Sequence, residues 1–206
     1  MIVQHIEVLV EEPSMEQALH LLLPKILSQD ISFSIYPHQC KHELLQRLPE
    51  RLRGYATWLP GDWRILVVID RDDDDCIALK TGLENFTRQA GLLSRSQARN
   101  QPYSIVNRLA IEELEAWFFG DWEAVRKAYP KAPRQIPLQA KYRDPDAILG
   151  GTWEAFERVL QKVGYFKGGL RKIEAARAVA QHMNPGCNRS GSFQTLRNVL
   201  LEMQTA

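Results

Sequence analysis

The stretch "ILVVIDRDDDDC", residues 65–76, decides which fold the sequence predicts. Its five consecutive apolar residues lack the alternation of a half-exposed strand, which is typical of a strand covered on both faces. Five carboxylates then follow within six positions, 70–75. Because aspartates this close repel one another, we expect cations or water to balance them. The pattern therefore predicts a buried strand with an acidic carboxyl end.

Strand patterns alternate with helical patterns through the first half of the chain. The predicted strands are residues 2–10, 31–36, 64–70 and 102–111, and the predicted helices between them are 14–23, 42–55 and 76–90. This alternation predicts an α/β fold, Rossmann-like, with a mostly parallel four-stranded sheet flanked by helices.

The character of the sequence changes after the fourth predicted strand. The stretch "EELEAWFFGDWEAVRKAYP", residues 112–130, is helical and aromatic, and a proline-punctuated connector follows to residue 151. Three further helical stretches span residues 152–163, 170–183 and 192–203. We expect an α/β core over residues 1–120 and a helical C-terminal extension over residues 121–206, packed together as one structural unit.

The composition of the 206 residues, with 45% hydrophobic and 25% charged residues and a net charge of +1, is that of a soluble globular protein. Charge is unevenly distributed, because residues 1–75 hold 13 Asp and Glu against 7 Lys and Arg. Such a distribution would suit metal ions at one end of a site and a polyanion along the rest, or simply an uneven solvated surface.

The three cysteines, the N-terminus and the hydropathy pattern bear on location. The cysteines show no CxxC spacing, which argues for a reducing compartment and against a structural zinc site. The first residues show no basic leader, and no apolar run approaches the roughly 20 residues of a membrane helix. We therefore expect a cytoplasmic protein that does not enter the membrane.

Two of the predicted strands end in carboxylates, Glu11 and Glu12 after the first and Asp70 and Asp72 after the third. Ligands of parallel α/β sheets bind outside the carboxyl ends of the strands. In extended backbone, residues two apart point to the same side, so Asp70 and Asp72 could converge on one cation. Carboxylate oxygens suit Mg²⁺, for which Mn²⁺ can substitute. The sequence thus predicts a Mg²⁺ site at this edge.

Three neighbouring acidic residues are weaker candidates for metal ligands. Asp74 and Asp75 precede the next predicted helix, where aspartate is also favoured as an N-cap or in the first turn. Glu12 directly follows Glu11. An EF-hand loop is excluded, because Asp75 replaces the turn glycine and Thr81 stands where the bidentate glutamate should be.

The segments "VLVEEPSMEQAL" (8–19), "VVIDRDDDDC" (67–76) and "ELEAWFFGD" (113–121) together resemble a known family. The first two are similar to the motifs of the Toprim domain, the catalytic core of topoisomerases, DnaG-type primases and OLD-family nucleases. The resemblance is closer to small stand-alone Toprim-like proteins encoded beside AAA-type ATPases, and it extends to about residue 183. Glu12 departs from the pattern, since the first Toprim motif has glycine at that position.

The resemblance implies Mg²⁺-dependent hydrolysis of phosphodiester bonds in DNA or RNA. Asp70 and Asp72 would hold one or two metal ions, and Glu11 would act as general acid/base or complete a second metal site. The resemblance also implies a partner ATPase of the AAA or ABC type and a role in anti-phage defence. The chain has no GxxxxGK[ST] loop, so any ATP hydrolysis would belong to that partner. Oligomeric state stays open, with a homodimer as one option.

Further residues could extend such a site. Glu112 and Glu115 would share a helical face, and we favour Glu115 as an additional metal ligand. The three aromatic residues that follow, Trp117, Phe118 and Phe119, are predicted to be core. Residues 126–177 carry 12 Lys and Arg against 5 Asp and Glu, a plausible phosphate-binding segment or a generic basic surface. The candidate phosphate contacts are Lys41, Lys141, Lys167 and Arg171, with Lys172 beside the last; Lys167 and Arg171 would share a face if both were helical.

Two other functions fit parts of the sequence. A phosphatase of the haloacid-dehalogenase type would use Asp70 as nucleophile and Asp72 as acid, although Asp74 stands where that motif normally has Thr or Val. A non-catalytic module that regulates an ATPase would use the carboxylates only to cap helices.

Overall fold

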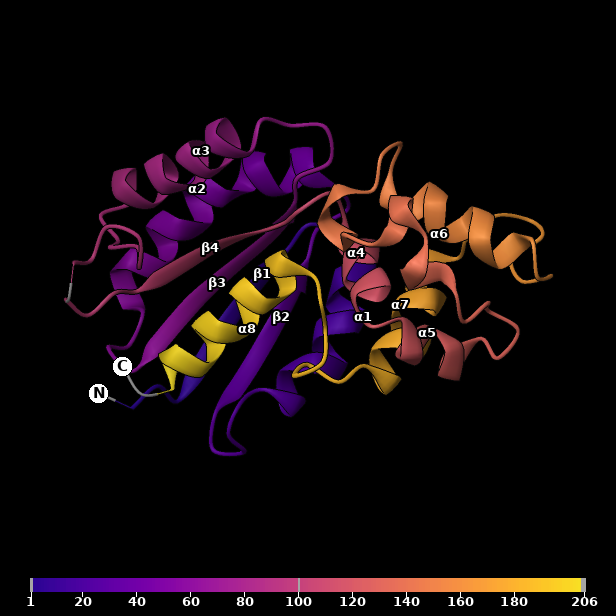
Figure 1. Ribbon diagram of the computed structural model, residues 1–206. Coiled ribbons are helices and arrows are strands. Elements are labelled where there is room, and N and C mark those ends of the chain that lie inside the picture. Colours follow the sequence, from indigo (N-terminus) through magenta and orange to yellow (C-terminus); the bar gives the residue numbers. More distant parts are fainter. Residues whose placement is uncertain (1, 100, 205–206) are drawn as a thin grey trace.

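A computed structural model describes residues 2–99 and 101–204. Four parallel strands form one sheet in the order β2-β1-β3-β4 (Figure 1). This arrangement confirms the predicted α/β fold with a parallel four-stranded sheet flanked by helices. The strands are β1 (His5–Val10), β2 (Ser32–Pro37), β3 (Trp63–Asp70) and β4 (Ile105–Ala110).

The two central strands explain the unbroken apolar runs of the sequence. Every residue of β1 is buried, and so is every residue of β3 after Trp63. Both strands are covered on two faces, so each face requires apolar side chains. The edge strand β2 is only partly buried.

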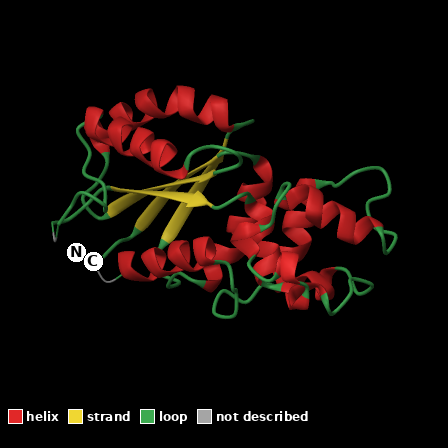
Figure 2. Ribbon diagram, turned by 45° about the horizontal axis from the view of Figure 1, so that its top comes forward, coloured by secondary structure: helices red, strands yellow, loops and turns green. Residues whose placement is uncertain are grey.

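Helices cover both faces of the sheet, as Figure 2 shows. On one face, α2 (Lys41–Trp58) and α3 (Cys76–Gln89) pack their leucines against Ile65, Val67 and Ile69. On the other face, α1 (Pro13–Leu22) and α8 (Gly191–Met203) join a cluster that includes Leu66 and Val68. A short 3₁₀ helix, η1 (Leu23–Lys25), follows α1.

The remaining helices gather beyond the carboxyl ends of the strands (Figure 1). The three aromatic residues predicted to be core, Trp117, Phe118 and Phe119, are buried there, and Phe119 stacks against Trp122 and Tyr142. This group comprises α4 (Leu114–Gly120), α5 (Trp122–Ala128), α6 (Thr152–Gln161) and α7 (Lys172–His182), with 3₁₀ helices η2 (Ile136–Leu138), η3 (Ala140–Tyr142) and η4 (Pro145–Ala147) in the connector.

The helix lengths and the cysteines relate to the predicted location of the protein. Within residues 2–99 and 101–204, no helix is both long and apolar enough to cross a membrane. Cys40, Cys76 and Cys187 are exposed and free of disulfides.

Candidate active site

The strand order places the carboxyl ends of β1 and β3 at a switch point, because the chain leaves β1 toward β2 on one side and returns to β3 on the other. Glu11 follows β1 directly, and Asp70 is the last residue of β3. The backbone N–H of Asp70 donates to Oε2 of Glu11 at 3.0 Å. The Glu11 carboxylate therefore contacts the backbone of Asp70, 59 residues later in the sequence, where ligands of open α/β sheets bind.

A third carboxylate, Glu115, enters the same region from α4. Glu115 is only 1% exposed to solvent, and Asp70 only 3%. Neither carboxylate oxygen of Glu115 has a hydrogen-bond partner among the described residues, and nor does Oδ1 of Asp70. Buried carboxylate oxygens without partners are costly, so this cluster needs either protons or a cation.

The pKa values of Glu11, Asp70 and Glu115 show that, without a cation, the cluster is balanced by protons. Burial raises the pKa of Glu11 to about 7, with a further contribution from Asp72. Burial, together with Glu11 and Glu12, raises the pKa of Asp70 well above its usual range. Burial raises the pKa of Glu115 to about 8, although Lys172 opposes the shift. Near neutral pH, the metal-free cluster therefore retains protons that exposed carboxyls would have lost.

Two lysines flank the cluster from different parts of the chain. Lys41, at the start of α2, places Nζ 2.6 Å from Oδ2 of Asp72 and 2.8 Å from Oδ2 of Asp74. Burial lowers the pKa of Lys41, but the bonds to Asp72 and Asp74 outweigh it, and the pKa is raised overall.

Lys172, at the start of α7, approaches the cluster from the other side, with Nζ 3.8 Å from Oε1 of Glu12. Burial opposes its charge, but Glu115 and Glu12 outweigh burial and raise the pKa of Lys172. Both lysines are therefore cations held at an acidic site.

The extended backbone that the sequence predicted across residues 70–72 is not formed. Strand β3 ends at Asp70, and Asp72 has a left-handed backbone with φ 49°. Its N–H donates at 2.8 Å to the carbonyl of Glu112, which is itself left-handed with φ 62°. Such conformations are uncommon and strained for residues other than glycine. The turn directs the carboxylate of Asp72 to Lys41.

The weaker acidic candidates have other partners. Asp75 caps α3, because its Oδ1 accepts from the N–H of Ala78 at 2.7 Å. Helix capping, the alternative to a metal-binding role, therefore explains the position of Asp75. Asp74 pairs with Lys41 and Glu12 accepts from the hydroxyl of Ser14.

The two glutamates that precede α4 differ from expectation. Glu112 pairs with Arg71 and lies before the helix, so it does not share a helical face with Glu115, as the spacing had predicted. Glu113 caps α6, because its Oε2 accepts from both the N–H and the hydroxyl of Thr152 and from the N–H of Trp153.

The basic candidates are dispersed. Lys141 lies over the ring of Tyr142, and Lys167 makes no hydrogen bond or ion pair with a described residue. Arg171 pairs with Glu174 and precedes α7, so Lys167 and Arg171 do not share a helical face. The sequence offered Lys172 only as a neighbour of Arg171, yet this lysine, like Lys41, faces the carboxylates.

The side chains of the site match the ligand chemistry of Mg²⁺ in part. Asp70 and Glu115 offer hard oxygen atoms that lack partners, as such an ion requires. Within the described chain, however, no three His, Cys, Asp or Glu side chains form a group that could hold a metal ion. Lysines engage Asp72, Asp74 and Glu12. The donor atoms suit Mg²⁺ chemically, but their present arrangement does not form a metal site, so coordination would require these side chains to rearrange.

The fold and the site together define an α/β protein with buried carboxylates at the switch point of a parallel sheet. The chain belongs to the family described as "Domain of unknown function (DUF4276)", whose model matches residues 10–201. That range includes every carboxylate and lysine of the site described above. No curated protein and no solved structure matches the chain.

Proposed function

We propose that the protein is a Mg²⁺-dependent nuclease that hydrolyses phosphodiester bonds in DNA or RNA. The observation that carries the proposal is the meeting of Glu11 and Asp70, with the unpartnered Glu115 nearby, at the switch point. The resemblance of the strand-end motifs to the Toprim domain supports the same chemistry.

Each side chain has a role in this proposal. Asp70 and Asp72 would hold Mg²⁺, or Mn²⁺ in its place, with Glu115 as a further ligand. When bound, such an ion neutralises charge on phosphate oxygens and makes water more nucleophilic. Glu11, which contacts Asp70, would take a proton from water and return one to the leaving oxygen.

In this proposal, the two lysines bind the phosphates of the substrate. Lys41 and Lys172 carry ammonium groups at the rim of the carboxylate cluster, where a phosphate would approach. An ammonium group binds phosphate as a point charge and so positions a nucleic-acid backbone without reading its bases. Lys141, Lys167 and Arg171 could contact more distant phosphates of the same strand.

The proposed partners come from the resemblance alone. They are a nucleic acid and an AAA- or ABC-type ATPase, in a cytoplasmic anti-phage system. An ATPase partner would supply the regulation that a small nuclease needs in a cell.

The test compares Glu11→Gln and Asp70→Asn with the wild type on labelled DNA and RNA in Mg²⁺ or Mn²⁺. Loss of the acid/base group in Glu11→Gln should lower the cleavage rate by about 10²–10⁴-fold, and loss of a metal ligand in Asp70→Asn should abolish cleavage. The matched control is Asp73→Asn, because Asp73 is exposed and makes no hydrogen bond or ion pair with a described residue. Its activity should equal that of the wild type.

Metal binding gives a readout that does not depend on a partner. Calorimetry should show that the wild type binds Mn²⁺ and that Asp70→Asn does not. A wild type that fails to bind Mn²⁺, or an Asp70→Asn protein that binds it equally well, would reject the metal-dependent mechanism. If the isolated wild type binds metal but cleaves nothing, the assay is repeated with a candidate AAA- or ABC-type ATPase and ATP.

A further inference from the structure

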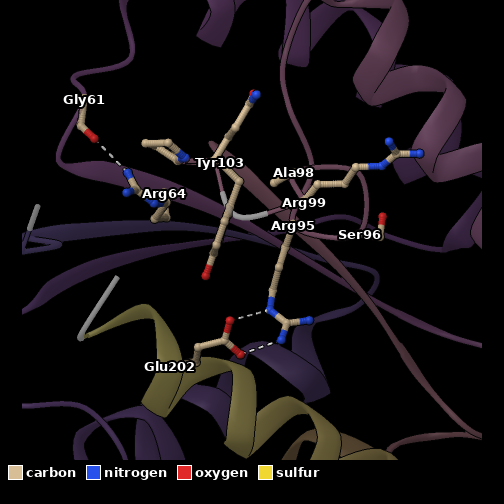
Figure 3. Close-up of a pocket in the computed structure, with 10 residues that line it drawn as sticks. Gly61, Arg64, Arg95, Ser96, Ala98, Arg99, Tyr103 and Glu202 are labelled. Carbon is tan, nitrogen blue, oxygen red and sulfur yellow. Dashed lines mark hydrogen bonds and ion pairs between the residues drawn. The ribbon is translucent and has the colours of Figure 1, made fainter.

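A cavity of about 580 Å³ opens at the end of the sheet where β3 and β4 begin, opposite the end that carries the carboxylates. It is lined by the segments that lead into β3 and β4 and by the last turn of α8 (Figure 3). Arg64 lies at the start of β3, whereas Asp70 lies at its end, so the strand separates the cavity from the candidate active site.

The cavity carries more positive than negative charge. Three arginines line it, Arg64, Arg95 and Arg99, and Glu202 binds one of them, accepting from Nε of Arg95 at 3.0 Å. Neither Arg64 nor Arg99 forms an ion pair with a described residue. Arginine stays protonated at all ordinary pH values. Arg64 is therefore balanced only by the more distant charge of Asp62, and Arg99 has no direct acidic partner among the described residues.

Arg64 is the more informative of the two because its residue is only 3% exposed. Its Nη1 donates to the backbone carbonyls of Gly61 and Trp63, at 2.7 and 2.8 Å. Its Nε is buried without a partner among the described residues. A buried charge whose direct hydrogen-bond partners are all neutral is costly, and an anion in the cavity would relieve that cost.

The rest of the wall is aromatic and apolar. Figure 3 shows Tyr103 between Arg64 and Arg95, and the guanidinium of Arg64 lies 5.6 Å from the centre of the Tyr103 ring. Ala98 and Pro102 add apolar surface. A free inorganic anion would leave this surface uncovered, whereas a ligand with a ring and an anionic group would use both parts of the wall.

The size and shape of the cavity narrow the choice of ligand. Its volume falls within the range of about 300–1,000 Å³ that is usual for small-molecule sites. Guanidinium groups pair with phosphate through parallel hydrogen bonds. The arginines surround a hollow, whereas a nucleic-acid backbone is followed by a groove or stripe of positive charge. These features favour a small phosphate ester.

We propose that this cavity binds a phosphate-bearing small molecule of mononucleotide size. Its phosphate pairs with Arg64 and with Nη1 of Arg95, since Glu202 occupies only Nε and Nη2 of that guanidinium. Its ring packs against Tyr103, and Arg99 adds attraction from the exposed rim. The site is independent of the proposed nuclease activity, because no carboxylate of that site lines the cavity.

Calorimetry on the full chain in EDTA tests the proposal, since EDTA keeps metal ions from the carboxylates at the other edge. The probes are AMP, adenosine, inorganic phosphate and a single-stranded oligonucleotide. AMP should bind more tightly than adenosine or phosphate. The double variant Arg95→Gln/Arg99→Gln should weaken AMP binding at least about tenfold, the equivalent of one charge-assisted contact.

Two further variants make the result specific. Arg64→Lys keeps the charge but loses the fork-shaped donor, so AMP binding should also weaken. Arg53→Gln is the matched control, because Arg53 is exposed on α2 and forms no ion pair with a described residue. Its affinity for AMP should be unchanged. If Arg64→Lys fails to fold by circular dichroism, the double variant decides.

Three results would overturn the proposal. The first is AMP binding no more tightly than adenosine, which would remove the role of the arginines. The second is wild-type affinity in the double variant. The third is binding of the oligonucleotide without binding of AMP, which would identify a nucleic-acid surface.

Discussion

Glu115 carries an ionisable carboxyl group in a buried, apolar environment, which is unusual for glutamate. It belongs to a short helix of apolar residues, is buried, and has no hydrogen-bond partner for either oxygen among the described residues. Burial raises its pKa to about 8, against 4.5 for an ordinary glutamate. In the metal-free protein, it therefore remains protonated across a pH range in which the unfolded chain has already lost that proton.

The shift predicts how stability changes with pH. Between about pH 4.5 and 8, the folded protein binds more protons than the unfolded chain, so the free energy of unfolding falls as pH rises. Glu115→Gln removes this titration and keeps the size of the side chain. Above pH 8, the metal-free variant should be more stable than the wild type by about 1–3 kcal/mol, and near pH 4 the two should be similar.

Urea unfolding in EDTA at several pH values measures the effect. Glu50→Gln is the control, since Glu50 is exposed on α2 and makes no ion pair with a described residue. Its stability should follow that of the wild type at every pH. A Glu115→Gln protein with the same pH dependence as the wild type would show that Glu115 does not hold its proton.

The same scale shows how much of the site the sequence could predict. Glu11 and Asp70 were paired correctly because the ends of neighbouring parallel strands meet whatever the loops do. The geometry of Asp72 was not predictable from spacing, since it depends on a left-handed turn held by the carbonyl of Glu112. Lys172 was missed as a site residue because it reaches Glu12 from 160 residues away.

Among the elements, α6 shows how a helix can depend on a distant residue. Gly151 precedes the helix and has no side chain to cap it. Glu113, from the turn before α4, instead accepts three hydrogen bonds from Thr152 and Trp153. The negative charge also lies at the N-terminus of α6, where the helix dipole favours it.

Removal of this cap should destabilise the protein. Glu113→Ala leaves two backbone N–H groups without an acceptor in a buried place, so the free energy of unfolding should fall by about 1–3 kcal/mol. Glu123→Ala is the comparison, because Glu123 is exposed and, among the described residues, forms an ion pair with Arg126 alone, on the same helix. That change should cost less than about 0.5 kcal/mol. Equal losses in chemical denaturation would mean that the cap contributes nothing.

Strands were easier to predict than the elements between them. Strand β3 was expected at residues 64–70 and begins one residue earlier, because a strand buried on both faces has an unmistakable apolar run. The connector at residues 130–151 was predicted only as a loop, yet it contains η2, η3 and η4. The last of these is held by Asp146, which accepts from Ser190 and Ser192, contacts that no local pattern indicates.

At the scale of the whole molecule, the site is completed by both parts of the chain. The α/β part supplies Glu11, Asp70 and Lys41, and the C-terminal part supplies Lys172 at the start of α7. Helix α7 packs against α1, and residues of both belong to the hydrophobic cluster that reaches the sheet. A change in the packing of α7 against α1 would therefore move the ammonium group of Lys172 relative to the carboxylates.

Lys25 joins these two helices at their other ends. Its Nζ donates to the carbonyls of Ala180, Gln181 and Met183, at 2.9, 2.8 and 2.9 Å. These carbonyls lie at the C-terminus of α7, where a positive charge is favoured by the helix dipole. One side chain from residue 25 thus satisfies three acceptors more than 150 residues away.

Lys25→Met should lower the free energy of unfolding by about 1–2 kcal/mol, less than a buried charge would lose because the ammonium is partly exposed to water. Lys162→Met provides the control, since Lys162 is exposed and its side chain makes no hydrogen bond or ion pair with a described residue. It should leave stability unchanged. Urea unfolding followed by tryptophan fluorescence and by circular dichroism should give coincident transitions in both proteins, because the two parts share one hydrophobic cluster. Separate transitions in Lys25→Met would instead show that residues 121–206 unfold independently of the α/β part.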